Sequence, residues 1–178
     1  MLGKWKKLRL VQELKNPWWT SRTEEYELPS GTKGEYHYVH TSGSSLTIPI
    51  LVDGRIVLVR QYRYLCDRES LEFPCGGVEE GSTYEATARM ELEEETGFAA
   101  EDLIEVGEFN PYNGVTDEFC KIYVAGRLSP VRTSRDVSEQ FERIFLTPDE
   151  IEKKARSGEI WDGMTLAAWL IARHRLPA

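Results

Sequence analysis

The chain contains little that would serve a membrane, a disulfide framework or a nucleic-acid partner. Its longest apolar run, Leu166–Ala172, is far shorter than the roughly 18–20 apolar residues of a membrane-spanning helix. Three unevenly spaced cysteines without a CxxC pair argue against disulfides and zinc, and favour a reducing, cytoplasmic compartment. With 22 basic and 30 acidic residues the net charge is −8, so a broad basic surface is lacking. We therefore expect neither a membrane nor a nucleic acid as partner.

The first third of the chain has the alternating pattern of β-strands. Turn residues at Pro29-Ser30-Gly31 and Asp53-Gly54 interrupt it, and the Asp-Gly pair between two apolar runs is typical of a hairpin. The alternating stretches are residues 7–14, 34–40, 46–52 and 55–64. Shorter strands are expected at 71–74, 104–109, 119–125 and 141–146.

Three helices are expected in the remainder, which indicates a mixed α/β fold. Ser82 with Glu85 three residues later has the spacing of a capping box and predicts a helix over 83–96 that stops at Gly97. Thr147, followed by a proline and then an acid at the third helical position, starts a second helix that ends near Gly158. The third is expected over 164–174.

The helix over 83–96 carries four glutamates near its end. At 100° per residue, Glu91, Glu94 and Glu95 lie within an arc of about 100°, whereas Glu93 points to the far side. Glu93 ends a row of alternating charges spaced four apart, but no Lys or Arg lies three or four positions from the other three. A solvated face is one interpretation of such a charge run. The unrelieved repulsion among these three carboxylates favours a second interpretation, a cation-binding site.

Oxygen ligands without His or Cys favour a hard ion, Mg²⁺ or alternatively Mn²⁺. Mg²⁺ commonly completes its coordination shell with water and phosphate oxygens of a substrate. An acidic protein can therefore act on a phosphate compound if a divalent cation lies between them.

This segment, Gly76–Phe98, resembles the Nudix box, a loop-helix-loop motif. The residues that match the motif in register are Gly76, Glu91, Leu92, Glu94, Glu95, Gly97 and Phe98. Two positions depart from it: Ser82 stands where the motif has its first Glu, and Met90 where it has Arg. Outside the box, residues 57–64 (VLVRQYRY) and 71–77 (LEFPCGG) are similar to the ADP-ribose and nucleotide-sugar pyrophosphatase branch.

The resemblance implies a Nudix α/β/α sandwich over residues 45–178 and an N-terminal antiparallel β domain over 1–44. In that branch the extra domain exchanges strands in a homodimer. The activity implied is metal-dependent hydrolysis of the diphosphate bond of nucleoside diphosphate sugars. Alternatives are a nucleoside triphosphate pyrophosphatase, or a non-catalytic nucleotide-binding module in which Ser82 and Met90 mark an eroded box.

The resemblance also implies roles for individual residues. The metal ligands would be Glu91, Glu94 and Glu95, with the main-chain oxygen of Cys75; Glu94 and Glu95 would thereby also be catalytic. Glu139 is the candidate base, in a polar loop where a solvated acid is an equal alternative and Asp136 is the fallback.

For the substrate, Arg63 is the expected phosphate clamp, with a surface ion pair as its alternative role. Trp18 or Trp19 would stack on the base, unless they serve core or interface packing. Arg60 and Glu118 complete the expected substrate-binding set.

Overall fold

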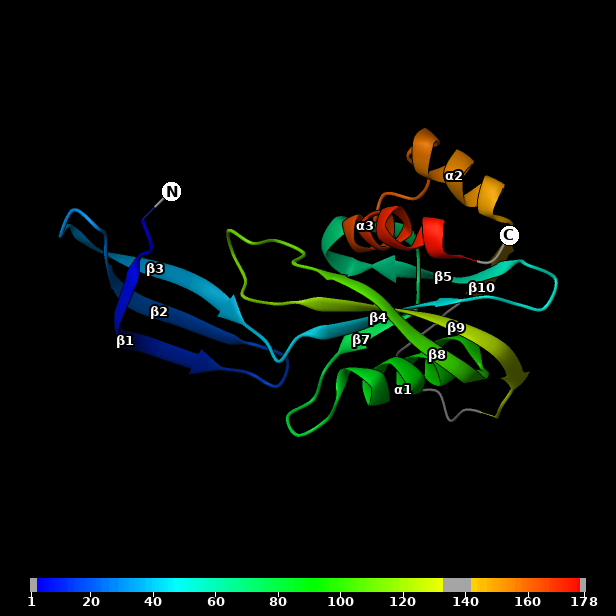
Figure 1. Cartoon of the computed structure of the whole chain (residues 1–178), viewed down its shortest axis with the longest axis horizontal. Coiled ribbons are helices and arrows are strands. Elements are labelled where there is room, and N and C mark those ends of the chain that lie inside the picture. Colours follow the sequence, from blue (N-terminus) through cyan, green and yellow to red (C-terminus); the bar gives the residue numbers. More distant parts are fainter. Residues whose placement is uncertain (1–2, 133–141, 177–178) are drawn as a thin grey trace. The chain divides into compact units, whose positions relative to one another are not determined.

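The computed structural model describes residues 3–132 and 142–176, which form two compact units (Figure 1). The first unit contains the residues up to Ser42 together with Asn110–Glu118. The second contains Gly43–Phe109 and the residues from Phe119 onward. Within the described ranges, no helix has both the length and the apolar character needed to cross a membrane.

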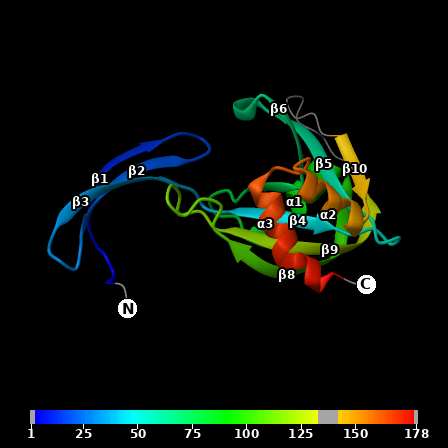
Figure 2. The same cartoon turned by 90° about the horizontal axis from the view of Figure 1, so that it is seen from above.

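The first unit is an antiparallel sheet of β1 (Lys6–Lys15), β2 (Thr20–Glu27) and β3 (Lys33–His40), in that order (Figure 2). The turn expected at 29–31 is present: Gly31 has φ +86° and Leu28 N–H donates to Thr32 O at 2.8 Å. Residues 110–118 return to β3, where Tyr36 Oη donates to Gly114 O at 3.0 Å.

The second unit contains two sheets. One has the order β7 (Cys75–Gly77), β4 (Ser44–Pro49), β9 (Cys120–Pro130), β8 (Phe98–Phe109), with β4 and β9 parallel. The other has the order β10 (Glu142–Leu146), β5 (Ile56–Arg63), β6 (Arg68–Glu72). The turn at Asp53-Gly54 is confirmed, but the strands beside it share only the Ile50–Ile56 bridge before they enter different sheets.

Helix α1 (Tyr84–Thr96) begins one residue later than the sequence predicted. Its N-cap is Thr83, whose Oγ1 accepts a hydrogen bond from Ala86 N–H at 3.1 Å, so the prediction of Ser82 as the cap is wrong. The predicted end is confirmed, because Gly97 has φ +71° and its N–H bonds to Glu93 O at 2.8 Å.

The other two helices follow their local signals. Helix α2 (Pro148–Ser157) has the full capping box of Thr147 and Glu150, and ends at Gly158. Helix α3 (Gly163–Ala172) is shorter than predicted and continues as a single 3₁₀ turn, η2 (Arg173–Arg175). A second 3₁₀ turn, η1 (Tyr64–Cys66), follows β5.

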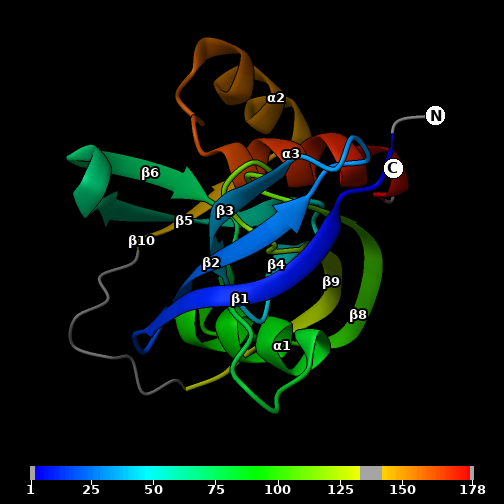
Figure 3. The ribbon, with the colours of Figure 1, turned by 90° about the vertical axis from the view of Figure 1, so that its left-hand side faces the viewer.

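Strand β4 separates the two helical layers of this unit. Ser45 and Thr47 face α1 and donate to its carbonyl oxygens, at 2.7 Å to Tyr84 and 3.4 Å to Ala88. The alternate residues Leu46 and Ile48 are fully buried on the other side. Figure 3 shows α1 and α3 on opposite sides of this sheet. The polar-apolar alternation of β4 thus fixes α1, the helix that carries the glutamates.

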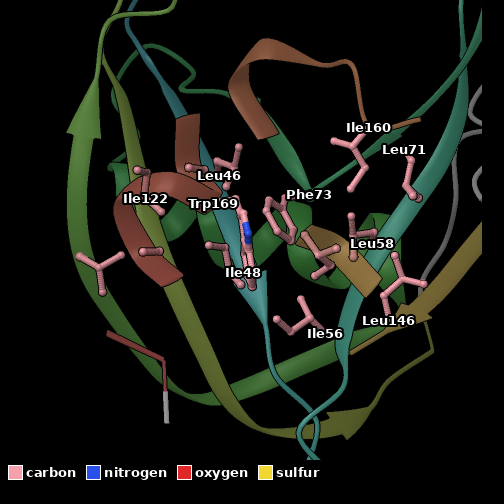
Figure 4. Close-up of a cluster of buried hydrophobic side chains, with 14 of the residues drawn as sticks. Leu46, Ile48, Ile56, Leu58, Leu71, Phe73, Ile122, Leu146, Ile160 and Trp169 are labelled. Carbon is pink, nitrogen blue, oxygen red and sulfur yellow. The ribbon is translucent and has the colours of Figure 1, made fainter. Parts of the chain in front are cut away.

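The core lies between the sheets and helices α2 and α3. Phe73 and Trp169 form its centre, with ring centroids 6.3 Å apart (Figure 4). Thr165 of α3 also accepts a hydrogen bond from Phe73 N–H at 3.1 Å. The segment before β7 is therefore held by α3, which fixes where Cys75 and Gly76 lie.

Candidate metal centre and phosphate site

Burial of one stripe of α1 sets the depth of each glutamate. Ala88, Leu92 and Thr96 are fully buried and fix the rotation of the helix. Glu95 is only 5% exposed, although it is an acid. Glu91 is half-buried, and Glu94 is exposed on the flank of the same face. The carboxylates that the sequence places on one face therefore range from the protein interior to the solvent.

Glu91 lies directly over Gly76 of β7. A Cβ on Gly76 would be 1.9 Å from Glu91 Oε1 and 2.1 Å from Cδ, so only glycine leaves room for this carboxylate. Gly76 pairs with Ser45 of β4, and Ser45 itself donates to α1. The sheet and the helix thus form a cradle that the Glu91 carboxylate fills.

Cys75, the residue before this glycine, lies next to two of the glutamates. The pKa of its thiol is raised well above its ordinary value by a hydrogen bond with the Cys120 thiol and by burial. The negative charges of Glu95 and Glu91 add to this rise in pKa. Cys75 therefore lies within reach of the charges of both Glu91 and Glu95.

This donor set fits a hard divalent cation that retains water and substrate ligands. Across residues 3–132 and 142–176, no three His, Cys, Asp or Glu side chains lie close enough to hold one ion. Mg²⁺ commonly uses only one or two carboxylates and completes its octahedron with other oxygens. The half-buried Glu91 and the buried Glu95, beside a backbone segment fixed by β4, meet that requirement.

Arg63, the expected phosphate clamp, forms a two-point ion pair with Glu72. Its Nε donates to Glu72 Oε1 at 2.7 Å and its Nη2 donates to Oε2. The hydrogen bond to Glu72 raises the pKa of Arg63, and the charges of Glu72, Asp162 and Glu95 act in the same direction. Arg63 therefore lies near the same buried glutamate as Cys75.

Strand alternation separates the two arginines of β5. Ile56 and Leu58 belong to the core beside α3 and α2, so the odd-numbered positions, including Arg63, face the α1 side. Arg60 has the opposite parity and donates to Glu142 at 3.0 Å. The structure does not bring Arg60 and Arg63 together on one face.

The remaining expected substrate residues lie in the first unit. Trp18 and Trp19 form the β1–β2 connection, where Asn16 Oδ1 accepts hydrogen bonds from both backbone N–H groups at 2.8 and 3.0 Å. Trp18 is 81% exposed and Trp19 45%. Glu118 is half-buried, with its N–H bonded to Thr116 Oγ1 at 3.1 Å. Glu139 and Asp136 lie outside the described residues.

A comparison with known families decides the classification. Residues 41–166 match the family model described as the NUDIX domain. The chain belongs to the Nudix family. The resemblance stated from the box is thereby confirmed, and the protein is a Nudix hydrolase.

Two curated relatives and one solved structure match most of this Nudix chain. An ADP-ribose pyrophosphatase of Bacillus subtilis (strain 168) is 32% identical over 147 residues, 82% of this chain and 80% of that protein. A methanol dehydrogenase activator of Bacillus methanolicus is 33% identical over 149 residues, covering 83% and 80%. The crystal structure of an ADP compounds hydrolase superposes with a TM-score of 0.84 over 99% of this chain and 96% of that one. At 20% identity it confirms the predicted mixed α/β fold.

One departure from the Nudix box has a visible structural consequence. Met90, in place of arginine, is 39% exposed. Arg89 does not replace it, because its guanidinium binds Glu85 at 3.0 Å and the carbonyl of Ala100 at 2.9 Å. Of the row of alternating charges that ends at Glu93, the Glu85–Arg89 pair is present, and it directs Arg89 away from the glutamate face.

Sequence reasoning missed Glu72 as the partner of Arg63. Its side chain is 5% exposed, it accepts from Arg63, and Gln61 Nε2 lies 3.4 Å from its Oε2. The available signal was an acid between the buried residues Leu71 and Phe73 in a strand. A buried acid needs a charged partner, and the partner could have been sought among the neighbouring arginines.

Proposed function

We propose that this Nudix hydrolase cleaves the diphosphate bond of ADP-ribose-like nucleoside diphosphate sugars, releasing a nucleoside monophosphate and a sugar phosphate. The observation that carries the proposal is that acidic side chains and an arginine lie near one another. Glu91 lies in the Gly76 cradle beside the buried Glu95, and Arg63 lies near Glu95 on the same side of the sheet. The relatives named for ADP-ribose and ADP compounds support this substrate class.

The residues that would hold the cation are Glu91, Glu94 and Glu95, with the main-chain oxygen of Cys75. Mg²⁺ is the proposed ion and Mn²⁺ the alternative, because all of these donors are oxygens. A cation bound there would neutralise charge on the diphosphate and lower the pKa of a water molecule. The role of the protein is to place the Glu95 carboxylate at low exposure and to hold Glu91 over Gly76.

The positive groups of the site would orient the diphosphate. Arg63 presents a planar guanidinium that can bind two phosphate oxygens at once. Arg60 and Glu118 are proposed to contact other parts of the substrate. Trp18 or Trp19 would stack on the base, and their exposure of 81% and 45% leaves ring surface for that contact.

For the catalytic base we retain Glu139, with Asp136 as the fallback. The two candidate bases are distinguished by which variant loses activity. Glu139→Gln should abolish most turnover while Asp136→Asn does not, measured as initial rates at saturating Mg²⁺ across pH 6–9. The reverse order would assign the base to Asp136.

A homodimer formed through the N-terminal β domain, residues 1–44, is also part of the proposal. Strand β1 is exposed along almost its whole length, and a three-stranded sheet needs a covered apolar face to be stable. The large apolar side chains exposed on β1 are Leu10, Val11 and Leu14. Light scattering should give a dimer for the wild type and a monomer for Leu14→Glu. The matched control Val52→Glu, at an exposed turn, should remain a dimer.

A cytoplasmic location is proposed from the cysteines. Cys66 is exposed, and no disulfide is present among the described residues. A fusion to a redox-sensitive reporter, imaged in the native host, would test this location. A signal confined to an oxidising compartment would contradict it.

A substrate panel tests the function directly. Purified protein with Mg²⁺ is incubated with ADP-ribose, ADP-glucose, GDP-mannose, UDP-glucose and the dNTPs, and products are separated by ion-exchange chromatography. A nucleoside monophosphate with the matching sugar phosphate from at least one sugar substrate is expected. Exclusive turnover of dNTPs would favour the triphosphate pyrophosphatase, and binding without any product would favour the non-catalytic module.

A further inference from the structure

Glu72 is a buried carboxylate to which neither the Nudix box nor the expected ligand set assigns a role. Its side chain is 5% exposed, and its chain neighbours Leu71 and Phe73 are both in the core. Glu72 pairs with Val59 in the β5–β6 ladder, so it lies on the same side of the sheet as Arg63. A carboxylate at this depth is costly unless it is bound by charged partners.

The geometry of the pair fixes one edge of the guanidinium. Arg63 uses Nε and Nη2 for the two oxygens of Glu72, a fork that sets the plane and the direction of the group. Gln61 approaches Glu72 Oε2 at 3.4 Å and supports the carboxylate from the same strand. The Arg63 side chain remains 46% exposed, so its other edge is available to a ligand.

Other carboxylates compete for this arginine. Asp162, the N-cap of α3, and Glu95 both lie close enough to stabilise the charge of Arg63. If the Arg63 side chain rotated freely, it could turn to Asp162 or to Glu95. Ordering it when the substrate binds would then reduce the affinity. The bond to Glu72 removes that freedom before the substrate arrives.

We propose that Glu72 is a positioning residue, which holds Arg63 by one edge so that the other edge can grip the diphosphate. The inference rests on the proposed role of Arg63 as phosphate clamp. Glu72 itself touches neither the substrate nor the reacting atoms. Its effect on the reaction is therefore expected to pass entirely through Arg63.

A double-mutant cycle of Glu72→Gln and Arg63→Met separates this role from general stabilisation. Glu72→Gln should raise the KM for ADP-ribose about tenfold, because a misplaced binding group costs at least that order, with a much smaller change in kcat. In the Arg63→Met background the same substitution should change KM by less than about twofold. Glu72→Asp keeps the charge at shorter reach and should recover part of the loss.

Glu105→Gln is the matched control, because it removes the carboxylate partner of Lys121, and neither residue of that pair has a proposed role in substrate binding. It should leave KM unchanged. Equal KM effects of Glu72→Gln in the two backgrounds, or a wild-type KM in Glu72→Gln, would overturn the inference. Melting curves identify variants that fail to fold, in which case Glu72→Asp provides the comparison.

Calorimetry with ADP in the presence of Mg²⁺ keeps this test independent of turnover. If the wild type hydrolyses no sugar substrate but Glu72→Gln weakens ADP binding about tenfold only when Arg63 is present, the proposed function fails and the positioning role stands. If the wild type hydrolyses ADP-ribose and Glu72→Gln behaves like Glu105→Gln, the positioning role alone fails. Absence of both turnover and ADP binding would refute both.

Discussion

Gly76→Ala tests the cradle most locally. The new methyl carbon would lie 1.9 Å from Glu91 Oε1, 2.1 Å from Cδ and 2.8 Å from Cγ. Comfortable separation of such atoms is about 3.5 Å, so the carboxylate must move by roughly 1.5 Å. Gly76 has no positive φ, and the effect therefore arises from this contact alone.

The displacement should cost activity far more than stability. Glu91 is half-buried and has a long side chain, so moving its carboxylate to another rotamer should cost about 1 kcal/mol. In a chain of this size that lowers Tm by roughly 2–4 °C. Displacement of Glu91, the proposed ligand, by more than an ångström should reduce kcat/KM about 100-fold. The Mg²⁺ concentration for half-maximal rate should also rise.

Gly77→Ala provides the matched control, because a Cβ there meets nothing within 4 Å. Initial rates on ADP-ribose over a Mg²⁺ series, with melting curves for both variants, complete the assay. Gly77→Ala should match the wild type in rate and Tm. Equal activity of the two alanine variants would show that Glu91 is not required over Gly76 and would refute the cradle as a metal site.

Four further substitutions test the cap of α1, an ion pair between helices and base stacking. Thr83→Ala should destabilise the protein by about 1 kcal/mol while Ser82→Ala leaves Tm unchanged, and the reverse order would reinstate Ser82 as the cap. The hydrogen bond from Arg173 lowers the pKa of Glu152 below its ordinary 4.5, so this pair stabilises the fold above that pH and loses its effect as pH falls through the lowered pKa. Glu152→Gln should therefore lower Tm at pH 7 but not in strong acid; a deficit independent of pH would contradict this. Trp18→Ala should raise KM for ADP-ribose by a factor of about 5–150 if this ring stacks on the base, and an unchanged KM would exclude that role.

Local signals in the sequence predicted the parts of the fold that depend on local energetics. The stop of α1 at Gly97 and the capping box of Thr147 need only nearby residues, and both are present. Ser82 and Thr83 are chemically equivalent caps one residue apart. Only packing of the helix on β4 decides between them.

Features that depend on pairing between distant residues could not be predicted. Strand β2 is almost wholly polar (TSRTEEYE) and lacks apolar alternation, so its pairing with neighbours on both sides is what makes it a strand. The contact of Arg63 with Glu72 follows from the register of β5 and β6. The sequence suggested that Arg63 is either a phosphate clamp or part of a surface ion pair. The observed ion pair joins the partly exposed Arg63 to the buried Glu72.

The central claim is that one face of α1 holds the cation that hydrolysis requires. Its most direct measurement compares kcat/KM on ADP-ribose with Mg²⁺ for Glu95→Gln and Glu93→Gln. Glu95 is 5% exposed beside Cys75 and Arg63, whereas Glu93 points to the other side of the same helix. We predict that Glu95→Gln loses at least about 100-fold while Glu93→Gln stays within about twofold of the wild type. Undiminished turnover by Glu95→Gln, or an equal loss in both variants, would contradict the account.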